Sequence, residues 1–357
     1  MEENKQHKTA LPETEPSPSA QAPEALLDIR GLRVEYHTDE DVVYAVNGLD
    51  LTIGKGESLG LVGETGAGKT TTALSVLRLI ADPPGKIMGG EIWFEGEDML
   101  QAKPARLREI RGSKISVIFQ DPMTSLNPVY SVGDQIAEVI HQHEKCSKEE
   151  GRRKAGDMLE MVGIPRARYD EYPHQFSGGM KQRVVIAMSI ACSPELILAD
   201  EPTTALDVTI QAQVLELMNE LKEKLRTSLL LITHDLGVVA QVCDRVAIMY
   251  AGEIVESGTI AEVFDHPHHP YTIGLFGSIP SLDETAEKLK PIQGQMPDPT
   301  ELPEGCAFAP RCPYATGACR TRKPEMTGVG GTQMVRCLAH QGVFESPELM
   351  EEVRHGR

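Results

Sequence analysis

The sequence predicts an α/β fold built on a mainly parallel sheet. Short apolar stretches such as "SLGLVGE" (58–64) and "SLLLITHD" (228–235) have the length and composition of strands that are buried on both faces. They alternate with segments whose apolar residues recur at helical spacing, the strongest of which is "TIQAQVLELMNELKEKL" (209–225). This alternation is typical of a parallel sheet covered by helices.

The remaining elements follow in chain order. Helices are expected at 69–80 and 180–192, strands at 91–96, 115–120 and 196–201, and a hairpin at 246–258 with its turn at Ala251-Gly252. The span from about 121 to 176 breaks the alternation and is predicted to be mostly helical. After about 265 the chain becomes rich in proline and loop-like, so we expect a domain boundary near 270.

The composition limits the classes of protein that need to be considered. The chain has 357 residues and a net charge of −18, which argues against a protein whose main partner is nucleic acid. No apolar run reaches the roughly 18 residues that span a bilayer, and no signal peptide is visible, so any membrane role is expected to come through a partner. Residues 1–24 are rich in Pro, Glu and Ser and are expected to be a disordered lead-in.

A phosphate-binding loop is predicted at Gly63–Thr70, "GETGAGKT", between a strand and a helix. Its glycines allow backbone N–H groups to surround phosphate oxygens. Lys69 can reach the β- and γ-phosphates, and the Thr70 hydroxyl suits Mg²⁺, which prefers oxygen ligands. The pattern indicates a nucleoside-triphosphate site.

Two acidic residues close a second buried strand, "LILADE" (196–201). Asp200 stands at the position expected for a carboxylate that binds a water molecule of Mg²⁺. Glu201 beside the γ-phosphate can orient and deprotonate a water molecule. Such a pair alone is weak evidence for a catalytic site, and it becomes stronger evidence in combination with the loop at Gly63–Thr70.

A second anion site is predicted in "QFSGGMKQR" (175–183). Ser177, Gly178 and Gly179 precede the helix expected at 180–192, and a glycine-rich helix N-terminus directs N–H groups and a positive dipole end toward an anion. The chain therefore has two candidate phosphate sites.

These motifs together resemble those of ABC-type ATPases, which are P-loop NTPases. "FSGGMKQ" is similar to the family signature LSGGQ, with Phe176 in place of Leu and Met180 in place of Gln. The resemblance implies that Ser177–Gly179 cover the γ-phosphate held by a partner subunit. Two ATP molecules would then be enclosed in a head-to-tail dimer.

The same resemblance assigns further roles along residues 26–260. It implies that Gln120 contacts metal and attacking water, that His234 contacts the γ-phosphate, and that Asp207 links the two sites. Tyr36 resembles the aromatic residue that stacks on adenine, although Tyr44 is close by and either could be packing. The catalytic residues are then Glu201, His234 and Gln120, and the Mg²⁺ ligands are Thr70, Gln120 and Asp200. The nucleotide-binding set is Tyr36, Gly63, Glu64, Thr65, Gly66, Ala67, Gly68, Lys69, Thr70, Thr71, Gln120, Ser177, Gly178, Gly179, Asp200 and Asp207.

The longer motifs resemble the D-type ATPase of oligopeptide and dipeptide importers, a group that also includes nickel importers. This resemblance implies an ABC ATPase domain at 25–270, with a helical subdomain at about 121–176 that receives two membrane permeases, and a group-specific extension at 271–357. It also implies a second ATPase subunit, an F-type paralogue, and an extracytoplasmic solute-binding protein. The chain would lie on the cytoplasmic face of the cell membrane. A soluble ABC ATPase, a subunit with an inactive site and an exporter are the alternatives.

Four of the seven cysteines crowd into the C-terminal part of the chain: Cys306, Cys312, Cys319 and Cys337. Their spacings include no C-x-x-C pair, so the pattern does not by itself indicate a zinc ribbon. Disulfides are not expected in the cytosol. Four thiolates are the usual ligands of an iron–sulfur cluster, and nearby basic residues should favour thiolates. Some members of the resembled group carry a [4Fe–4S] cluster at such cysteines. Zinc and unliganded thiols remain the alternatives.

Overall fold

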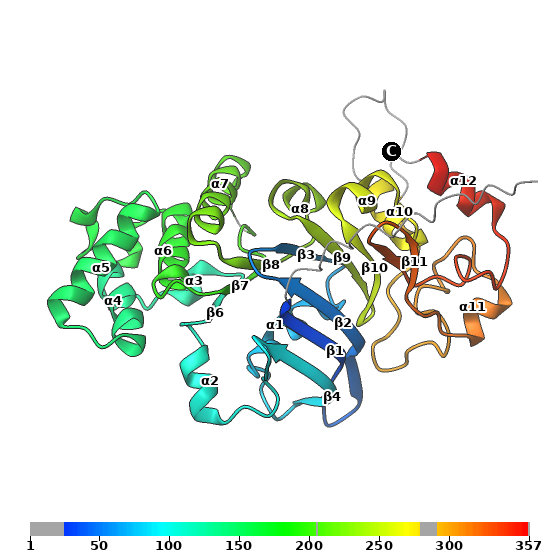
Figure 1. The fold of residues 1–357 in the computed structure, drawn as a ribbon, viewed down its shortest axis with the longest axis horizontal. Coiled ribbons are helices and arrows are strands. Elements are labelled where there is room, and N and C mark those ends of the chain that lie inside the picture. The colour runs from blue at the N-terminus through cyan, green and yellow to red at the C-terminus, as the bar shows by residue number, and fades with distance from the viewer. Residues whose placement is uncertain (1–24, 205, 279–290, 356–357) are drawn as a thin grey trace, which may run out of the picture.

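The computed structural model describes residues 25–204, 206–278 and 291–355. The expectation for residues 1–24 lies outside this range. Two sheets form the centre, a group of helices projects on one side of them, and the C-terminal segment covers the other side (Figure 1).

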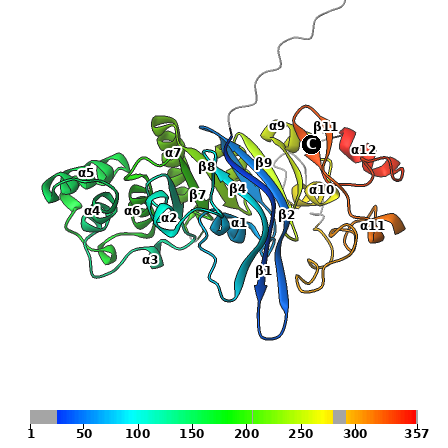
Figure 2. The same cartoon turned by 60° about the horizontal axis from the view of Figure 1, so that its bottom comes forward.

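The smaller sheet is antiparallel and has the strand order β2-β1-β4-β5. Its strands are β1 (Ala25–His37), β2 (Val42–Gly54), β4 (Gly85–Phe94) and β5 (Glu97–Asp98). The strand expected at 91–96 is therefore the second half of β4 and belongs to this sheet, not to the parallel one. Figure 2 shows β1 and β2 as a long hairpin that extends beyond the rest of the molecule.

The larger sheet has the order β11-β12-β10-β9-β3-β8-β7-β6. Its strands are β3 (Ser58–Val62), β6 (Ile115–Ile118), β7 (Leu196–Asp200), β8 (Ser228–Thr233), β9 (Arg245–Tyr250), β10 (Glu253–Thr259), β11 (Thr327–Gly330) and β12 (Gln333–Val335). The four pairs that join β6, β7, β8, β3 and β9 are parallel, which confirms the predicted sheet. The three pairs that join β9, β10, β12 and β11 are antiparallel. The hairpin turn at Ala251-Gly252 is also confirmed, since both residues have positive φ (45° and 82°), as a tight hairpin turn requires.

Helices pack against the strands of the larger sheet. The described helices are α1 (Lys69–Val76), α2 (Pro104–Ile110), α3 (Pro122–Ser125), α4 (Val132–His143), α5 (Lys148–Met161), α6 (Gly178–Ile190), α7 (Val208–Leu225), α8 (Leu236–Val242), α9 (Ile260–Asp265), α10 (Pro270–Gly277), α11 (Gly317–Thr321) and α12 (Pro347–His355), with 3₁₀ turns at Arg166–Arg168 and Pro173–Gln175. Between β6 and β7 the described chain forms only helices and loops. Ser131 and Ser147 cap α4 and α5 there, each accepting a backbone N–H three residues later.

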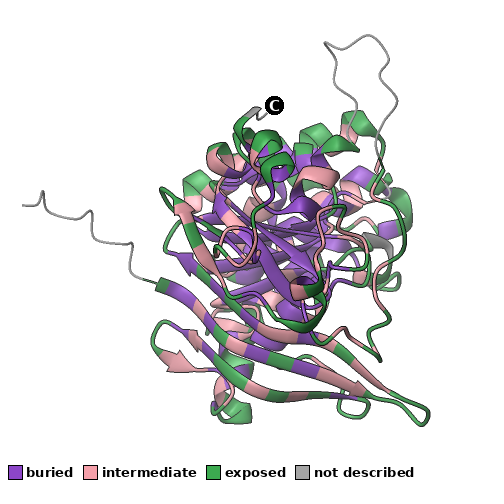
Figure 3. Cartoon of the chain, turned by 90° about the vertical axis from the view of Figure 1, so that its right-hand side faces the viewer, coloured by how far each residue is buried: buried purple, intermediate pink, exposed green. Residues whose placement is uncertain are grey.

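The larger sheet separates two apolar cores. Along β8, Leu229 and Leu231 face the core shared with the helices, whereas Leu230 and Ile232 face the core shared with the smaller sheet. Burial on both faces explains why these strands consist of apolar residues throughout. Figure 3 shows the central strands buried along their length and the smaller sheet alternating between buried and exposed residues.

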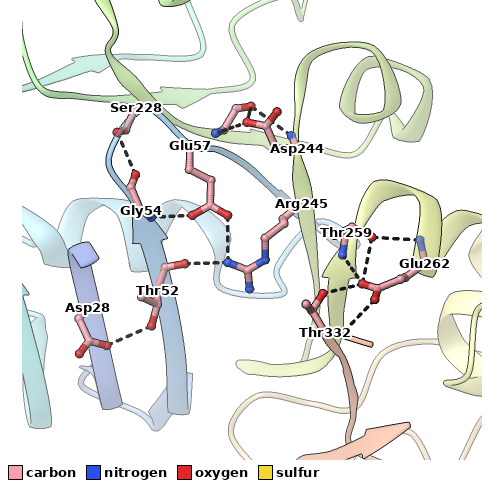
Figure 4. Close-up of polar contacts among 11 residues, drawn as sticks. Asp28, Thr52, Gly54, Glu57, Ser228, Asp244, Arg245, Thr259, Glu262 and Thr332 are labelled. Carbon is pink, nitrogen blue, oxygen red and sulfur yellow. Dashed lines mark hydrogen bonds and ion pairs between the residues drawn. The ribbon is translucent and has the colours of Figure 1, made fainter. Parts of the chain in front are cut away.

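Polar contacts join the C-terminal segment to the preceding part of the chain (Figure 4). Glu262 accepts hydrogen bonds from the Thr332 N–H (2.7 Å), the Thr332 hydroxyl (2.6 Å) and the Thr259 N–H (2.9 Å). Burial raises the pKa of Glu262, but these bonds outweigh it and bring the pKa down to about 2. The loop-like segment expected after 265 therefore includes a strand, β12, that extends the sheet at β10.

Candidate nucleotide site

The loop Gly63–Thr70 has a shape that requires glycine at several positions. It leaves the buried strand β3 and enters α1, as the sequence predicted. A Cβ atom on Gly63 would lie 2.2 Å from the Met249 carbonyl oxygen, and one on Gly68 would lie 2.3 Å from the Ala45 carbonyl oxygen. Gly68 also has φ of 100°. Side chains at these positions would force the loop apart, so the glycines are needed for the fold as well as for phosphate approach.

Lys69 occupies the centre of this loop. Its side chain is largely buried, and its Nζ donates to the carbonyl oxygens of Gly63 (2.7 Å) and Glu64 (3.0 Å). Burial lowers the pKa of Lys69, and three nearby carboxylates, led by Glu201, oppose that shift. The ammonium group is thus enclosed by the loop that the sequence assigned to phosphate.

Thr70 and Asp200 meet where α1 begins and β7 ends. Their side chains form a hydrogen bond. Burial raises the pKa of Asp200, and the bond from Thr70 acts against that rise. In the described part of the chain, no three His, Cys, Asp or Glu side chains are placed to hold a metal ion. A hydroxyl and a carboxylate nevertheless fit Mg²⁺, which in nucleotide sites takes its other ligands from phosphate and water.

Glu201 is the point at which several motifs converge. Its carboxylate accepts from Gln120 Nε2 (2.9 Å) and from the Thr204 hydroxyl (2.9 Å), and its Oε1 lies 3.1 Å from His234 Nδ1. The structure therefore brings together the three residues that the sequence proposed as catalytic. Thr204 was missed, although it stands three residues after Glu201 in the same motif.

Glu201 has an unusual backbone conformation and a partly buried carboxylate whose charge is stabilised by hydrogen bonds. Its φ of 46° lies in the left-handed region, which is uncommon for residues other than glycine and costs energy. Burial raises its pKa, but the bonds from His234 and Thr204 outweigh burial and lower it overall. The carboxylate is consequently ionised near neutral pH and available as a base.

Ser177–Gly179 lie on a different part of the molecule. Ser177 precedes α6, which packs against α3, α4, α5 and α7, whereas α1 packs against β2 and β7 (Figures 1 and 2). A Cβ on Gly179 would lie 2.3 Å from Ile210 Cγ2 in α7. Gly179 thus also permits close packing of α6 on α7, a role that the sequence did not suggest.

Two further expected residues have defined contacts. Asp207 caps α7, accepting the Ile210 N–H at 2.9 Å. Tyr36 Oη lies 3.2 Å from Thr71 Oγ1, which places this ring beside the first turn of α1. Tyr44 is 38% exposed on the neighbouring strand β2.

The four C-terminal cysteines line one small, largely apolar cavity, with Phe308, Leu338 and Leu349 among its other walls. All four are free thiols. Burial raises the pKa of Cys306 to about 11 and that of Cys312 to about 12, and it raises the pKa of Cys337 as well. The expected effect of basic neighbours is wrong, because burial dominates and nearby cations are engaged elsewhere: Arg311 with Glu64 and Lys323 with Glu253.

The fold and the site define a P-loop nucleoside-triphosphatase. The family model "ABC transporter" matches residues 46–204, and the model "Oligopeptide/dipeptide transporter, C-terminal region" matches residues 255–319. The chain belongs to the ABC transporter ATP-binding proteins, in the oligopeptide/dipeptide transporter group, and as a member of that family it is an ATPase.

Relatives and solved structures agree with this membership. The chain is 49% identical over 318 residues to "Oligopeptide transport ATP-binding protein AppD" of Bacillus subtilis (strain 168), with 88% of this chain and 97% of that protein covered. It is 51% identical over 332 residues to "Oligopeptide transport ATP-binding protein OppD" of the same organism, with 91% and 93% covered. The ATP-binding cassette MJ0796, solved as a dimer bound to ADP and Pi, has a TM-score of 0.59 and 27% identity, covering 66% of this chain and 98% of that one. No helix in the described part of the chain has the length and apolar character needed to cross a bilayer.

Proposed function

We propose that the chain hydrolyses ATP to energise import of oligopeptides or dipeptides across the cytoplasmic membrane. The observation that carries the chemistry is the convergence of Gln120, His234 and Thr204 on the Glu201 carboxylate. The peptide class is supported by the names of relatives that match over about nine-tenths of the chain, including its C-terminal segment.

Each group then has a defined task. Lys69 and the loop N–H groups bind the β- and γ-phosphates, and Glu201 accepts a proton from the attacking water. Gln120 and His234 orient that water and the γ-phosphate. Mg²⁺ held by Thr70, Asp200 and Gln120 would offset the charge of the phosphates. Tyr36 would stack on adenine.

The pocket is proposed to be completed by a second ATPase subunit. Because Ser177–Gly179 lie at the start of α6 and the phosphate loop leads into α1, Ser177–Gly179 are available to a nucleotide on another subunit. Asp207 would link the two sites across the dimer. We propose an F-type paralogue as partner, with two permeases docked on the helices at about 121–176, a separate solute-binding protein, and a position on the cytoplasmic face of the membrane.

Reconstitution tests this function. The chain, its paralogue, the permeases and the binding protein are placed in proteoliposomes, and uptake of labelled di- and oligopeptides is measured with and without ATP. We expect ATP-dependent peptide uptake. Uptake of Ni²⁺ with none of peptide would assign the chain to a nickel importer, and ATP hydrolysis that neither permeases nor substrate affect would contradict an importer role.

We also propose a [4Fe–4S] cluster at Cys306, Cys312, Cys319 and Cys337. The proposal is supported by the cavity that all four cysteines line. In the described residues no three of these side chains are yet grouped to hold a metal, so binding of the cluster would have to draw the thiols together. The cluster would cross-link a segment that has only small apolar cores of its own. It requires the buried thiols to lose their protons on binding, as metal ligands do.

Iron analysis distinguishes the alternatives for these cysteines. Protein purified without oxygen is expected to be brown and to contain about four iron atoms per chain. A Cys312→Ser variant should lose most of this iron, whereas Cys192→Ser, outside the cavity, should keep it. A colourless product without iron in both aerobic and anaerobic preparations would overturn the cluster, and stoichiometric zinc would replace it with a zinc site.

A further inference from the structure

An ion pair links the C-terminal segment to the phosphate loop. Arg311 Nη1 lies 3.0 Å and 3.1 Å from the two carboxylate oxygens of Glu64, the second residue of the loop. The Arg311 side chain is only 6% exposed and that of Glu64 is 32% exposed. The two residues are 247 positions apart in the sequence. The phosphate loop is therefore in polar contact with a residue far along the chain, in the C-terminal segment.

The Arg311 side chain is itself held firmly. Its Nε donates to the Gln293 carbonyl oxygen (3.1 Å) and its Nη1 contacts the Tyr250 hydroxyl (3.4 Å). Tyr250, Tyr271 and Phe308 form a buried aromatic cluster beside it, with ring centroids 4.6–5.5 Å apart. A guanidinium fixed by this many contacts has little freedom to follow a moving partner, so it defines where Glu64 lies.

Glu64 connects this fixed group to the ammonium of the phosphate site. Its N–H donates to the Tyr271 hydroxyl (3.0 Å), and its carbonyl oxygen accepts from Lys69 Nζ (3.0 Å). Arg311 thus contacts the side chain of Glu64, and Tyr271 and Lys69 contact its backbone on either side. A shift of Glu64 would move the carbonyl group that holds Lys69.

The C-terminal segment also lies beside the phosphate loop and β2 at two other points. A Cβ on Gly66, in the phosphate loop, would lie 3.4 Å from Met296 Cε. The Tyr44 N–H on β2 donates to the Pro299 carbonyl oxygen at 2.8 Å. Figures 1 and 2 both show the segment around residue 300 beside β2.

We propose that Arg311 is a positioning residue of the nucleotide site: through Glu64 it holds the phosphate loop in the conformation that binds ATP, so the C-terminal segment sets nucleotide affinity. This inference rests on the proposed ATP site at Gly63–Thr70. Removing the largely buried Arg311 leaves the partly exposed Glu64 carboxylate without its partner, which makes the loop prefer other conformations. Since only part of the population is then competent, apparent affinity falls while the chemistry of the competent fraction is unchanged.

The first test is Arg311→Gln in the full chain within the assembled transporter. We expect the KM for ATP and the Kd of a fluorescent ATP analogue to rise about tenfold, with kcat essentially unchanged. Arg320→Gln, an exposed arginine of the same segment, is the matched control and should behave as wild type. Iron content equal to wild type would show that the effect does not pass through the neighbouring Cys312.

A double-mutant cycle tests whether Arg311 acts through Glu64. Glu64→Ala should raise KM to a similar extent, and the double variant should be no worse than either single one. Arg311→Lys should recover part of the affinity, because it keeps the charge and loses the geometry of the guanidinium. Wild-type KM in Arg311→Gln, or effects that simply add in the double variant, would overturn the proposal.

The two proposals can fail separately. If Lys69→Ala binds ATP as well as wild type does, the nucleotide site itself is wrong. If Lys69→Ala loses binding while Arg311→Gln keeps it, only the positioning role fails. Should Arg311→Gln not fold, Glu64→Ala and Arg311→Lys carry the test: raised KM in both supports the proposal, and wild-type KM in either one overturns it.

Discussion

Glu201→Gln is expected to abolish turnover while leaving ATP binding nearly intact. The amide has the size of the carboxylate and can still meet Gln120 and Thr204, but it cannot accept a proton from water. General bases contribute about 10²- to 10⁴-fold to rate, so we expect a loss of about 10³-fold in kcat. ATP turnover of the assembled transporter and equilibrium binding of an ATP analogue measure the two quantities independently.

The same variant should remain in the closed, ATP-bound dimer, because phosphate release no longer follows binding. Gel filtration with ATP would detect this species. Glu195→Gln is the matched control, since Glu195 precedes the same strand and pairs with Lys114 at the surface. Turnover equal to wild type would remove Glu201 from the role of base.

Lys69→Ala is expected to fail one step earlier, at nucleotide binding. The ammonium is the buried cation of the loop, and its removal also frees the carbonyl groups of Gly63 and Glu64. A hydrogen bond to a charged group contributes about 1.5–3 kcal/mol, which predicts a rise in the Kd for ATP of up to about 100-fold.

Isothermal titration with MgATP measures this rise directly. Lys86→Ala, which removes an exposed lysine from β4, should bind as wild type does. Retention of wild-type affinity by Lys69→Ala would place the phosphates somewhere other than Gly63–Thr70.

The phosphate loop and its flanking elements were predictable because their determinants are local. Gly63–Thr70 stand between a strand and a helix that each show their own periodicity, and the loop's glycines are explained by immediate sterics. Asp200 and Glu201 were predictable for a similar local reason, because charged residues mark the end of a buried apolar strand. The roles of Gln120 and His234 came from resemblance, and the contacts of both with Glu201 support those roles.

Long-range contacts explain what the sequence did not reveal. Nothing near Glu64 indicates that an arginine 247 residues later will pair with it. Gly179 was interpreted only as a ligand-facing residue, because its neighbour Ile210 lies on another helix. The left-handed φ of Glu201 likewise has no signature in its residue type.

The central claim is that another subunit must complete the nucleotide pocket of this chain. It is tested most directly by ATP turnover of the isolated monomer and of the assembled transporter, each as wild type and as Ser177→Arg. The account predicts that the monomer binds ATP without hydrolysing it, that assembly restores turnover, and that Ser177→Arg abolishes the restored activity. A monomer that hydrolyses ATP at the assembled rate, whether or not Ser177 is replaced, would contradict it.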